Sequence, residues 1–151
     1  MRFVICGAGK VGYSIADYLS RDTNSITIID KDPALIEKIT SDLDVNGLVG
    51  NAASPEVLSN AGLAEADMII AVTYTDEVNM VACQVAHSLF NVPKKIARVR
   101  SQDFLNPSWT NLFSRDHMPI DVIISPEVEV AKAIHRRLMI VGATEVIPIH
   151  D

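Results

Sequence analysis

The sequence predicts an α/β protein in which a doubly wound, parallel β-sheet of about six strands carries helices on both faces. Short apolar runs, typical of strands buried on both faces, alternate with helical patterns along the 151-residue chain. Asp-Pro and Ser-Pro pairs, which suit the start of a helix, follow three of these runs. Regular alternation of this kind is typical of a parallel sheet covered on both sides.

Six runs have the length and the apolar composition of buried strands. In chain order they are Phe3–Cys6, Ile26–Ile29, Leu48–Val49, Met68–Val72, Lys95–Val99 and Val122–Ile124. Glycine follows the first and the third run, which indicates a tight turn where the chain leaves the sheet. The segment 101–121 is the least regular, and we expect a helix or a loop connection there.

Helical patterns occupy the segments that follow most of these strands. We expect helices from Val11 through Leu19, from Pro33 past Ile39, from Pro55 to Ala61, from Asp76 to about Phe90, and from Pro126 through about Ile140. In the fourth helix the positions expected to face inward are Val78, Val81, Ala82, Val85 and Leu89. The last helix is apolar over a wide arc, which suits core packing and dimerisation about equally.

The composition excludes several classes of protein. The net charge of −6, from 19 acids against 13 bases, argues against broad nucleic-acid binding. The two cysteines, Cys6 and Cys83, stand among apolar residues, so we expect buried free thiols in a reducing compartment. No run approaches 18 apolar residues, so we expect no direct membrane insertion. These features predict a cytoplasmic protein.

A glycine-rich turn joins the first strand to the first helix. Gly7, Gly9 and Gly12 form the pattern G-x-G-x-x-G, with a strand before it and a helix after it. Gly7 permits the tight turn, Gly9 lets a pyrophosphate approach the backbone, and Gly12 lets the helix pack closely on the strand. The amides of Lys10 and Val11 then lie at a helix N-terminus, which favours an anion. The pattern predicts a Rossmann-type site for a dinucleotide.

An acid stands where this site needs one. Asp30 closes the second strand, 18 residues after Gly12, where a carboxylate is expected to bind the adenosine ribose. The same carboxylate would repel a 2′-phosphate, so NAD(H) is favoured over NADP(H), although the neighbouring Lys31 weakens this preference. The alternative is a glycine turn beside a solvated aspartate.

Later strand ends supply the other candidates, because ligands lie across the carboxyl ends of parallel strands. Asn51 and Ala52 follow the third strand, where small residues admit an adenine and Asn51 either hydrogen-bonds the ligand or forms an Asx-type turn. Backbone and hydroxyl groups of Thr73 and Tyr74, after the fourth strand, are expected to face the ligand.

Three polar residues near these strand ends have competing interpretations. We expect Asp76 to cap its helix, and Asn79 either faces the site or lies on the surface. Arg98 is unusual in a strand buried on both faces and needs a partner, for which a pyrophosphate, Asp76 or Glu77 would serve.

Several segments together resemble a known family. The segments MRFVICGAGKVGYSIADYL, TIIDKD, GLVGNAASPEVLSNAGLAEADMIIAVTYTDEVNMVACQVA and KKIARVRS are similar to the nucleotide-binding domain of Trk-type potassium-uptake regulators. This is the family of domains that regulate potassium conductance (RCK, or KTN). The resemblance covers nearly the whole chain and keeps the order of the motifs. Many relatives have an acid at the position of Asn51, where this chain departs from the pattern.

The resemblance implies a regulatory protein that is not an enzyme. Such proteins are peripheral cytoplasmic subunits that bind NAD(H), or in relatives ATP or ADP, and control a potassium-translocating membrane subunit. The positions that match their nucleotide contacts are Gly7, Ala8, Gly9, Lys10, Val11, Asp30, Asn51, Thr73, Tyr74 and Arg98. Residues 1–140 correspond to the Rossmann-type domain. Residues 141–151 are strand-like, and we expect them to begin a further domain that this sequence lacks.

The residues themselves also argue against catalysis. The cofactor fold occupies the chain, and the four histidines are poorly placed for acid–base work beside a nicotinamide. No cysteine–histidine cluster has metal-ligand spacing, so we expect no metal site. The leading hypothesis is a nucleotide sensor in a homo-oligomer, a dimer or a higher ring. The rival hypothesis is an NAD-dependent oxidoreductase fragment.

Overall fold

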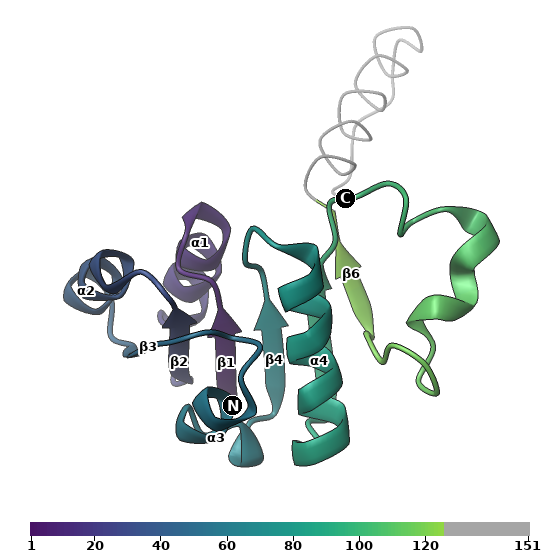
Figure 1. Ribbon diagram of the computed structural model, residues 1–151. Coiled ribbons are helices and arrows are strands. Elements are labelled where there is room, and N and C mark those ends of the chain that lie inside the picture. Colours follow the sequence, from purple (N-terminus) through teal and green to yellow (C-terminus); the bar gives the residue numbers. More distant parts are fainter. Residues whose placement is uncertain (126–151) are drawn as a thin grey trace, which may run out of the picture.

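The computed structural model describes residues 1–125, which form a six-stranded, all-parallel sheet in the order β3-β2-β1-β4-β5-β6 (Figure 1). The strands are β1 (Arg2–Cys6), β2 (Ser25–Asp30), β3 (Asn46–Val49), β4 (Met68–Ala71), β5 (Lys94–Arg98) and β6 (Val122–Ile124). The predicted doubly wound parallel sheet is therefore confirmed. The last helix and the strand-like segment expected within 126–151 lie outside the described residues.

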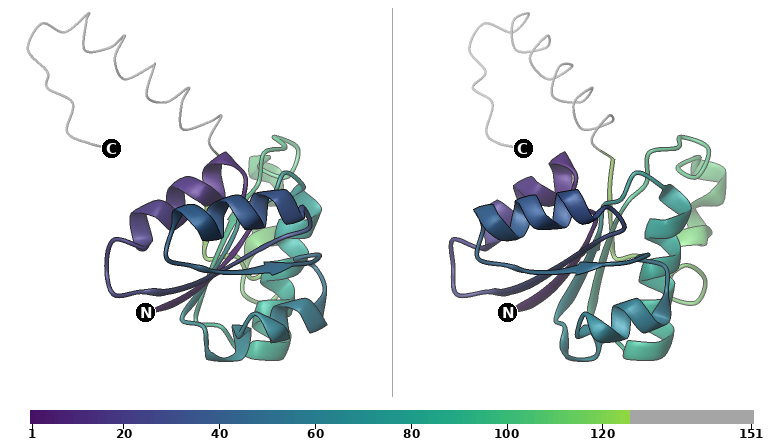
Figure 2. Two further views of the ribbon diagram at one scale, coloured as in Figure 1. Left: turned by 90° about the vertical axis from the view of Figure 1, so that its left-hand side faces the viewer. Right: turned by 60° about the vertical axis from the view of Figure 1, so that its left-hand side comes forward.

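Helices cover both faces of the sheet (Figures 1 and 2). They are α1 (Lys10–Leu19), α2 (Pro33–Asp42), α3 (Pro55–Asn60) and α4 (Asp76–Phe90), with short 3₁₀ helices η1 (Leu63–Glu65) and η2 (Pro107–Phe113). Side chains of β1 alternate between two cores: Phe3 and Ile5 pack with α1 and α2, and Val4 and Cys6 pack with α3 and α4. This alternation explains why the strand is apolar on both faces.

Helix α4 turns most, but not all, of the predicted inward positions to the core. Ala82 is buried and Val78 and Val85 pack against the core, as expected, but Val81 and Leu89 are 43% and 60% exposed. The fully buried positions of the helix are Asp76, Asn79, Met80, Ala82, Cys83 and Ala86. The prediction for Val81 and Leu89 was wrong because the buried positions next to them in the chain belong to Met80, Ala82, Cys83 and Ala86.

Both cysteines are buried free thiols, as the sequence predicts. Burial disfavours the thiolate and raises the pKa of Cys83 to about 12, and it raises the pKa of Cys6 further still. Buried thiols in apolar surroundings are typical of structural cysteines and not of reactive ones.

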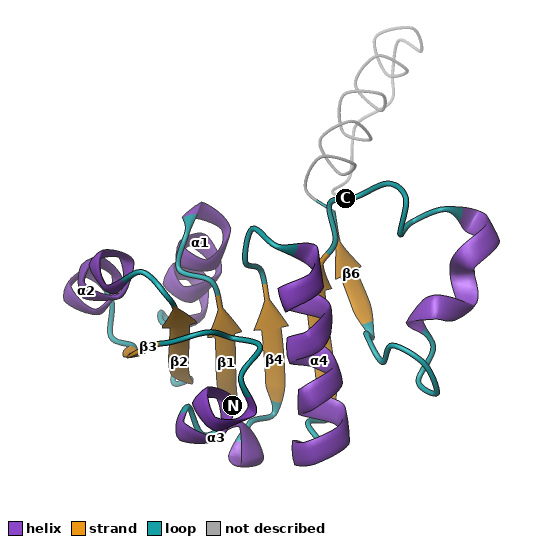
Figure 3. Cartoon of the chain, in the orientation of Figure 1, coloured by secondary structure: helices purple, strands orange, loops and turns teal. Residues whose placement is uncertain are grey.

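The segment between β5 and β6 is a loop around η2, in agreement with the expected helix or loop (Figure 3). It is attached by four partly buried side chains, Phe104, Leu105, Phe113 and Met118, that pack on the core beside α3 and α4. None of the helices in the described part of the chain is long and apolar enough to span a membrane.

The strand order reverses at β1. From β1 the chain builds outward to β2 and β3 and then, from the other side of β1, to β4, β5 and β6. Ligands of open parallel sheets bind at such a reversal, outside the carboxyl ends of the strands. A ligand is therefore expected at the edge of the sheet where Asp30 ends β2 and where Gly7 and Thr73 come after β1 and β4.

Candidate functional site

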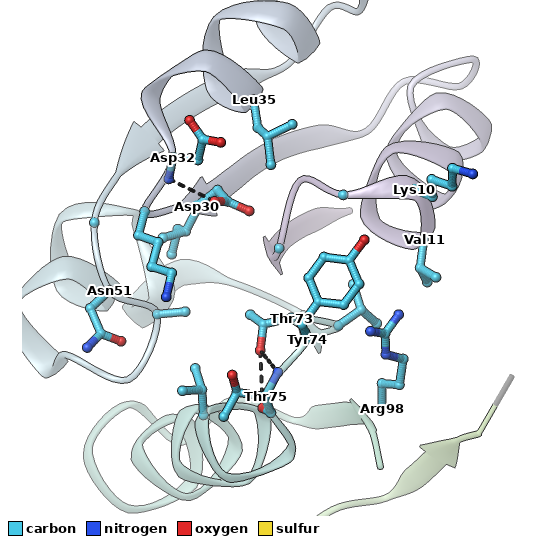
Figure 4. Close-up of a pocket in the computed structure, with 18 of the residues that line it drawn as sticks. Lys10, Val11, Asp30, Asp32, Leu35, Asn51, Thr73, Tyr74, Thr75 and Arg98 are labelled. Atoms are coloured by element: carbon cyan, nitrogen blue, oxygen red, sulfur yellow. Dashed lines mark hydrogen bonds between the residues drawn. The ribbon is translucent and has the colours of Figure 1, made fainter. Parts of the chain in front are cut away.

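An open cavity of about 590 Å³ lies at this edge of the sheet (Figure 4). Most of the predicted site residues line it together: Gly7, Gly9, Lys10, Val11, Asp30, Lys31, Asn51, Ala52, Thr73, Tyr74 and Arg98. Ala8 and Gly12 do not line the cavity: both are buried, Ala8 within the glycine turn and Gly12 within α1. The lining residues that sequence reasoning did not assign to the site include Asp32, Thr75 and Arg100.

Two of the three glycines, Gly7 and Gly12, occupy positions that no larger residue could take without overlap. Gly7 has a positive φ of 108°, and a Cβ there would lie 2.8 Å from the carbonyl oxygen of Val72. A Cβ at Gly12 would overlap the carbonyl oxygen of Gly7. A Cβ at Gly9 would meet only the ring of Tyr74, at 3.4–3.6 Å. Gly7 and Gly12 therefore serve the fold, whereas Gly9 leaves the cavity side of the turn bare.

The N-terminus of α1 faces this bare surface. Gly9 is the N-cap, no side chain caps the helix, and its first turn holds no acid. The first amides of a helix have no partner within the helix, so those of Lys10 and Val11 are open donors at the cavity wall. With the helix dipole they form a site suited to an anion.

Asp30 is held rigidly beside the glycine turn. Its Oδ2 accepts a hydrogen bond from the amide of Ala8 at 2.8 Å, and its Oδ1 accepts one from the amide of Asp32 at 2.8 Å. Asp32 in turn caps α2 by accepting from the amide of Ala34 at 2.9 Å. Because each carboxylate oxygen has a further lone pair, Asp30 can still accept a ligand hydroxyl in the cavity.

The turn after β3 takes the Asx geometry that the sequence left as an alternative. Oδ1 of Asn51 accepts from the amide of Ala53 at 2.9 Å, so the side-chain nitrogen of Asn51 remains able to donate a hydrogen bond to a ligand. Ala52 is buried and packs into the core beside the turn. Lys31 is exposed at the cavity rim.

The buried side chain of Asn79 links the ends of β4 and β5 through hydrogen bonds. Its Oδ1 accepts from the amide and the hydroxyl of Thr73 at 2.9 and 2.7 Å, and its Nδ2 donates to the carbonyls of Thr73 and Arg98 at 3.1 and 2.9 Å. Asn79 therefore lies behind the cavity wall and not on the surface. The hydroxyl of Thr73 points to Asn79, which differs from the expectation that it faces a ligand.

Asp76 does not cap its own helix, and that prediction was wrong. Thr75 is the N-cap of α4 and makes no side-chain cap bond. The buried carboxylate of Asp76 accepts from the amides of Arg100 and Ser101 at 2.9 and 2.8 Å. Asp76 binds these amides because the chain that leaves β5 passes the start of α4. The local sequence does not reveal this contact.

Arg98 is buried against an aromatic ring. Its side chain is 6% exposed, its guanidinium lies 5.2 Å from the centre of the Tyr74 ring, and its Nε has no hydrogen-bond partner within residues 1–125. No ion pair to Asp76 or Glu77, the protein partners that the sequence suggested, is present among these residues. Arg98 and Arg100 give the β5 end of the cavity a positive character, opposite the acids Asp30 and Asp32 at the β2 end.

No group of three or more histidine, cysteine or acidic side chains that could hold a metal ion occurs within residues 1–125. The cavity instead combines a carboxylate, a helix N-terminus and arginines. It can accept hydroxyl donors at one end and bind anionic groups along the glycine turn and at the other end.

Known proteins share both the sequence and the fold. The chain is 54% identical over 151 residues to the Trk system potassium uptake protein TrkA of Azorhizobium caulinodans, covering all of this chain and 33% of that protein. It is 46% identical over 147 residues to the TrkA protein of Halomonas elongata, covering 97% of this chain and 32% of that protein. The chain thus spans about a third of the length of these curated relatives.

Solved structures with low sequence identity share the fold. The TrkA-N domain of inner membrane protein ybaL from Escherichia coli matches with a TM-score of 0.78 at 18% identity, over 91% of this chain and 96% of that one. GsuK bound to ADP matches at 0.69 and 16% identity, over 92% of this chain and 34% of that one. The GsuK channel bound to NAD matches at 0.66 and 16% identity, over 83% and 21%.

The TrkA-N domain family model matches residues 3–126, which cover all the elements described above except Arg2, the first residue of β1. The chain therefore belongs to the TrkA-N domain family.

Proposed function

We propose that this chain is a nucleotide-binding regulatory domain that reads an adenine nucleotide without transforming it. The observation that carries this proposal is the common cavity of the glycine turn and Asp30. In the proposed complex, a ribose hydroxyl donates to the Asp30 carboxylate, and the phosphates accept from the amides of Lys10 and Val11. These contacts match the order of groups in adenosine diphosphate, the moiety shared by NAD(H), ADP and ATP.

We propose NAD(H) as the first candidate ligand. A dinucleotide would extend from Asp30 across the glycine turn toward the β5 end of the cavity. The acids Asp30 and Asp32 at the ribose end disfavour a 2′-phosphate and hence NADP(H). The structural relative GsuK has been solved with NAD, which supports the choice.

ATP or ADP is the second candidate, and one observation favours it. Arg98 and Arg100 line the far end of the cavity, where a terminal phosphate would find cationic partners. The buried Nε of Arg98 lacks a hydrogen-bond partner in the described part of the chain, so an anionic oxygen would satisfy it. GsuK has also been solved with ADP.

The proposed biological role is control of potassium uptake. The curated relatives are Trk system potassium uptake proteins, and we extend that role to this chain as part of a peripheral cytoplasmic regulator. The nucleotide would bias two arrangements of a homo-oligomer, a dimer or a higher ring, that act differently on a membrane potassium-translocating subunit. A ligand that contacted both arrangements equally would shift nothing.

The chemistry of the cavity supports binding over catalysis. Neither histidine nor cysteine is among the residues that line it, and both oxygens of Asp30 already accept backbone hydrogen bonds. A dehydrogenase needs an acid or base beside the nicotinamide and a pocket for its substrate. Steady oxidation of NADH with a small carbonyl substrate would contradict the regulatory proposal.

Titration calorimetry with NADH, NAD⁺, ATP, ADP and adenosine tests the proposal. We expect saturable binding of at least one adenine nucleotide at one site per chain. GTP is the matched control for the base, and NADPH is the control for the ribose contact. Absence of saturable binding by every adenine nucleotide would refute the proposed function.

A further inference from the structure

The ring of Tyr74 occupies the approach to the glycine turn. Its Oη, Cε2 and Cζ atoms lie 3.4, 3.5 and 3.6 Å from the position that a Cβ would take at Gly9. The second glycine of this fingerprint is bare so that a pyrophosphate can approach the backbone there. The side chain that a Cβ at Gly9 would meet therefore stands where the pyrophosphate would arrive. Figure 4 shows this ring projecting into the middle of the cavity.

The same ring contacts the arginine at the far side of the cavity. The guanidinium of Arg98 lies 5.2 Å from the ring centre, within the range of a cation–π interaction. The arginine is buried and its Nε has no hydrogen-bond partner among the described residues. The ring thus occupies a position from which a phosphate oxygen could accept a charge-assisted hydrogen bond from Arg98, an interaction stronger than the contact with the ring.

Little holds the ring in this place. Tyr74 is 70% exposed, and its hydroxyl makes no hydrogen bond within residues 1–125. Its backbone lies on the short loop between β4 and α4, next to Thr73, which Asn79 anchors. Rotation of the side chain out of the cavity therefore costs the contact with Arg98 and little buried surface.

We propose that Tyr74 is a specificity-determining residue that competes with ligand phosphate for the glycine turn and for Arg98. This inference rests on the proposed function and deepens it. A nucleotide with phosphates displaces the ring and takes its place beside Gly9 and Arg98. Adenosine, which ends before the glycine turn, leaves the ring in place. Tyr74 therefore lowers the affinity for phosphorylated ligands selectively, because in the free protein the Tyr74 ring occupies the place that their phosphates would take.

The test is titration calorimetry of the 151-residue chain with ADP, NADH and adenosine. The wild type is compared with Tyr74→Ala, with Tyr74→Phe, and with Tyr18→Ala, a control of equal 70% exposure outside the cavity. Loss of a cation–π contact of ordinary strength predicts that Tyr74→Ala binds ADP and NADH about two- to fivefold more tightly. Adenosine affinity is expected to change less than twofold. Tyr74→Phe keeps the ring and should match the wild type, as should Tyr18→Ala.

Each contrary result has a distinct meaning. Weaker or unchanged binding of ADP and NADH by Tyr74→Ala, with the wild type binding normally, would overturn the competition and leave the proposed function intact. Equal tightening for adenosine would also overturn it, because the effect would not depend on phosphate. Failure of wild type and variant alike to bind any adenine nucleotide, ADP and NADH included, would instead refute the proposed function together with this inference. Urea unfolding of each variant confirms that the compared proteins are folded.

Discussion

Replacement of Asp30 by alanine is the perturbation with the largest expected effect on binding. The carboxylate joins the glycine turn, through the amide of Ala8, to the start of α2, through the amide of Asp32, with both hydrogen bonds at 2.8 Å. In the proposed complex it also accepts a ribose hydroxyl. Asp30→Ala removes all three interactions without adding bulk to the cavity.

The magnitude follows from these contacts. A hydrogen bond to a charged group contributes about 1.5–3 kcal/mol, so loss of the ribose contact weakens binding by about 10- to 150-fold. The amide of Ala8, a residue that is 4% exposed, loses its partner as well. A buried unpaired amide costs about 1–3 kcal/mol, so the free energy of unfolding should fall by a similar amount.

The assay separates these two effects with a matched variant. Oδ2 of Asp67 accepts from the amide of Arg2 at 2.8 Å, at the amino ends of β1 and β4 and away from the cavity, so Asp67→Ala loses a bond of the same length at a more exposed position. Calorimetry with ADP should show the loss only in Asp30→Ala, whereas urea unfolding should show destabilisation in both, with the smaller change in Asp67→Ala. An ADP affinity of folded Asp30→Ala within twofold of the wild type would refute the ribose contact.

Three further predictions follow from other parts of the structure. Gly9→Ala should fold with a free energy of unfolding within about 0.5 kcal/mol of the wild type but lose ADP binding, whereas Gly12→Ala, whose Cβ overlaps the Gly7 carbonyl, should fail to fold stably. Circular dichroism and calorimetry check both variants, and equal behaviour of the two would contradict the roles assigned to these glycines. Asn79→Ala should lower the free energy of unfolding by about 1–3 kcal/mol, because it leaves buried groups of Thr73 and Arg98 unpaired. The control Gln84→Ala on the same helix should change it by less than about 0.5 kcal/mol. Similar urea midpoints for the two variants would argue against a link between β4 and β5 through Asn79. Hydrogen bonds from Tyr13 and Lys38 hold the pKa of Asp42 below its ordinary value of 3.8, so this carboxylate stabilises the fold above that pH and the stabilisation is lost as pH falls through the lowered pKa. The difference in unfolding free energy between wild type and Asp42→Asn should therefore be largest near pH 7 and vanish under acid conditions. A difference that does not change with pH would contradict this prediction.

The parts of the site that sequence reasoning located are those set by local order along the chain. The glycine turn, the N-terminus of α1 and Asp30 fall within one β-α-β unit, so their spacing determines how they meet. The first two glycines and the acid accordingly line one cavity. The parallel sheet was predictable for a similar reason, because each strand is a separate apolar run bounded by turn residues.

The parts that sequence reasoning missed depend on contacts between distant segments. Asn79 reaches the carbonyl of Arg98, and Asp76 reaches the amides of Arg100 and Ser101, across the gap between α4 and the end of β5. Neither the helical period nor a capping pattern contains that information.

A crystal structure of the chain with ADP, the moiety common to NAD(H) and ATP, tests the central claim most directly. We predict that phosphate oxygens lie about 2.7–3.2 Å from the amide nitrogens of Lys10 and Val11 and that a ribose hydroxyl lies at a similar distance from the carboxylate of Asp30. ADP bound at another surface, or bound in the cavity with its ribose away from Asp30, would contradict the account.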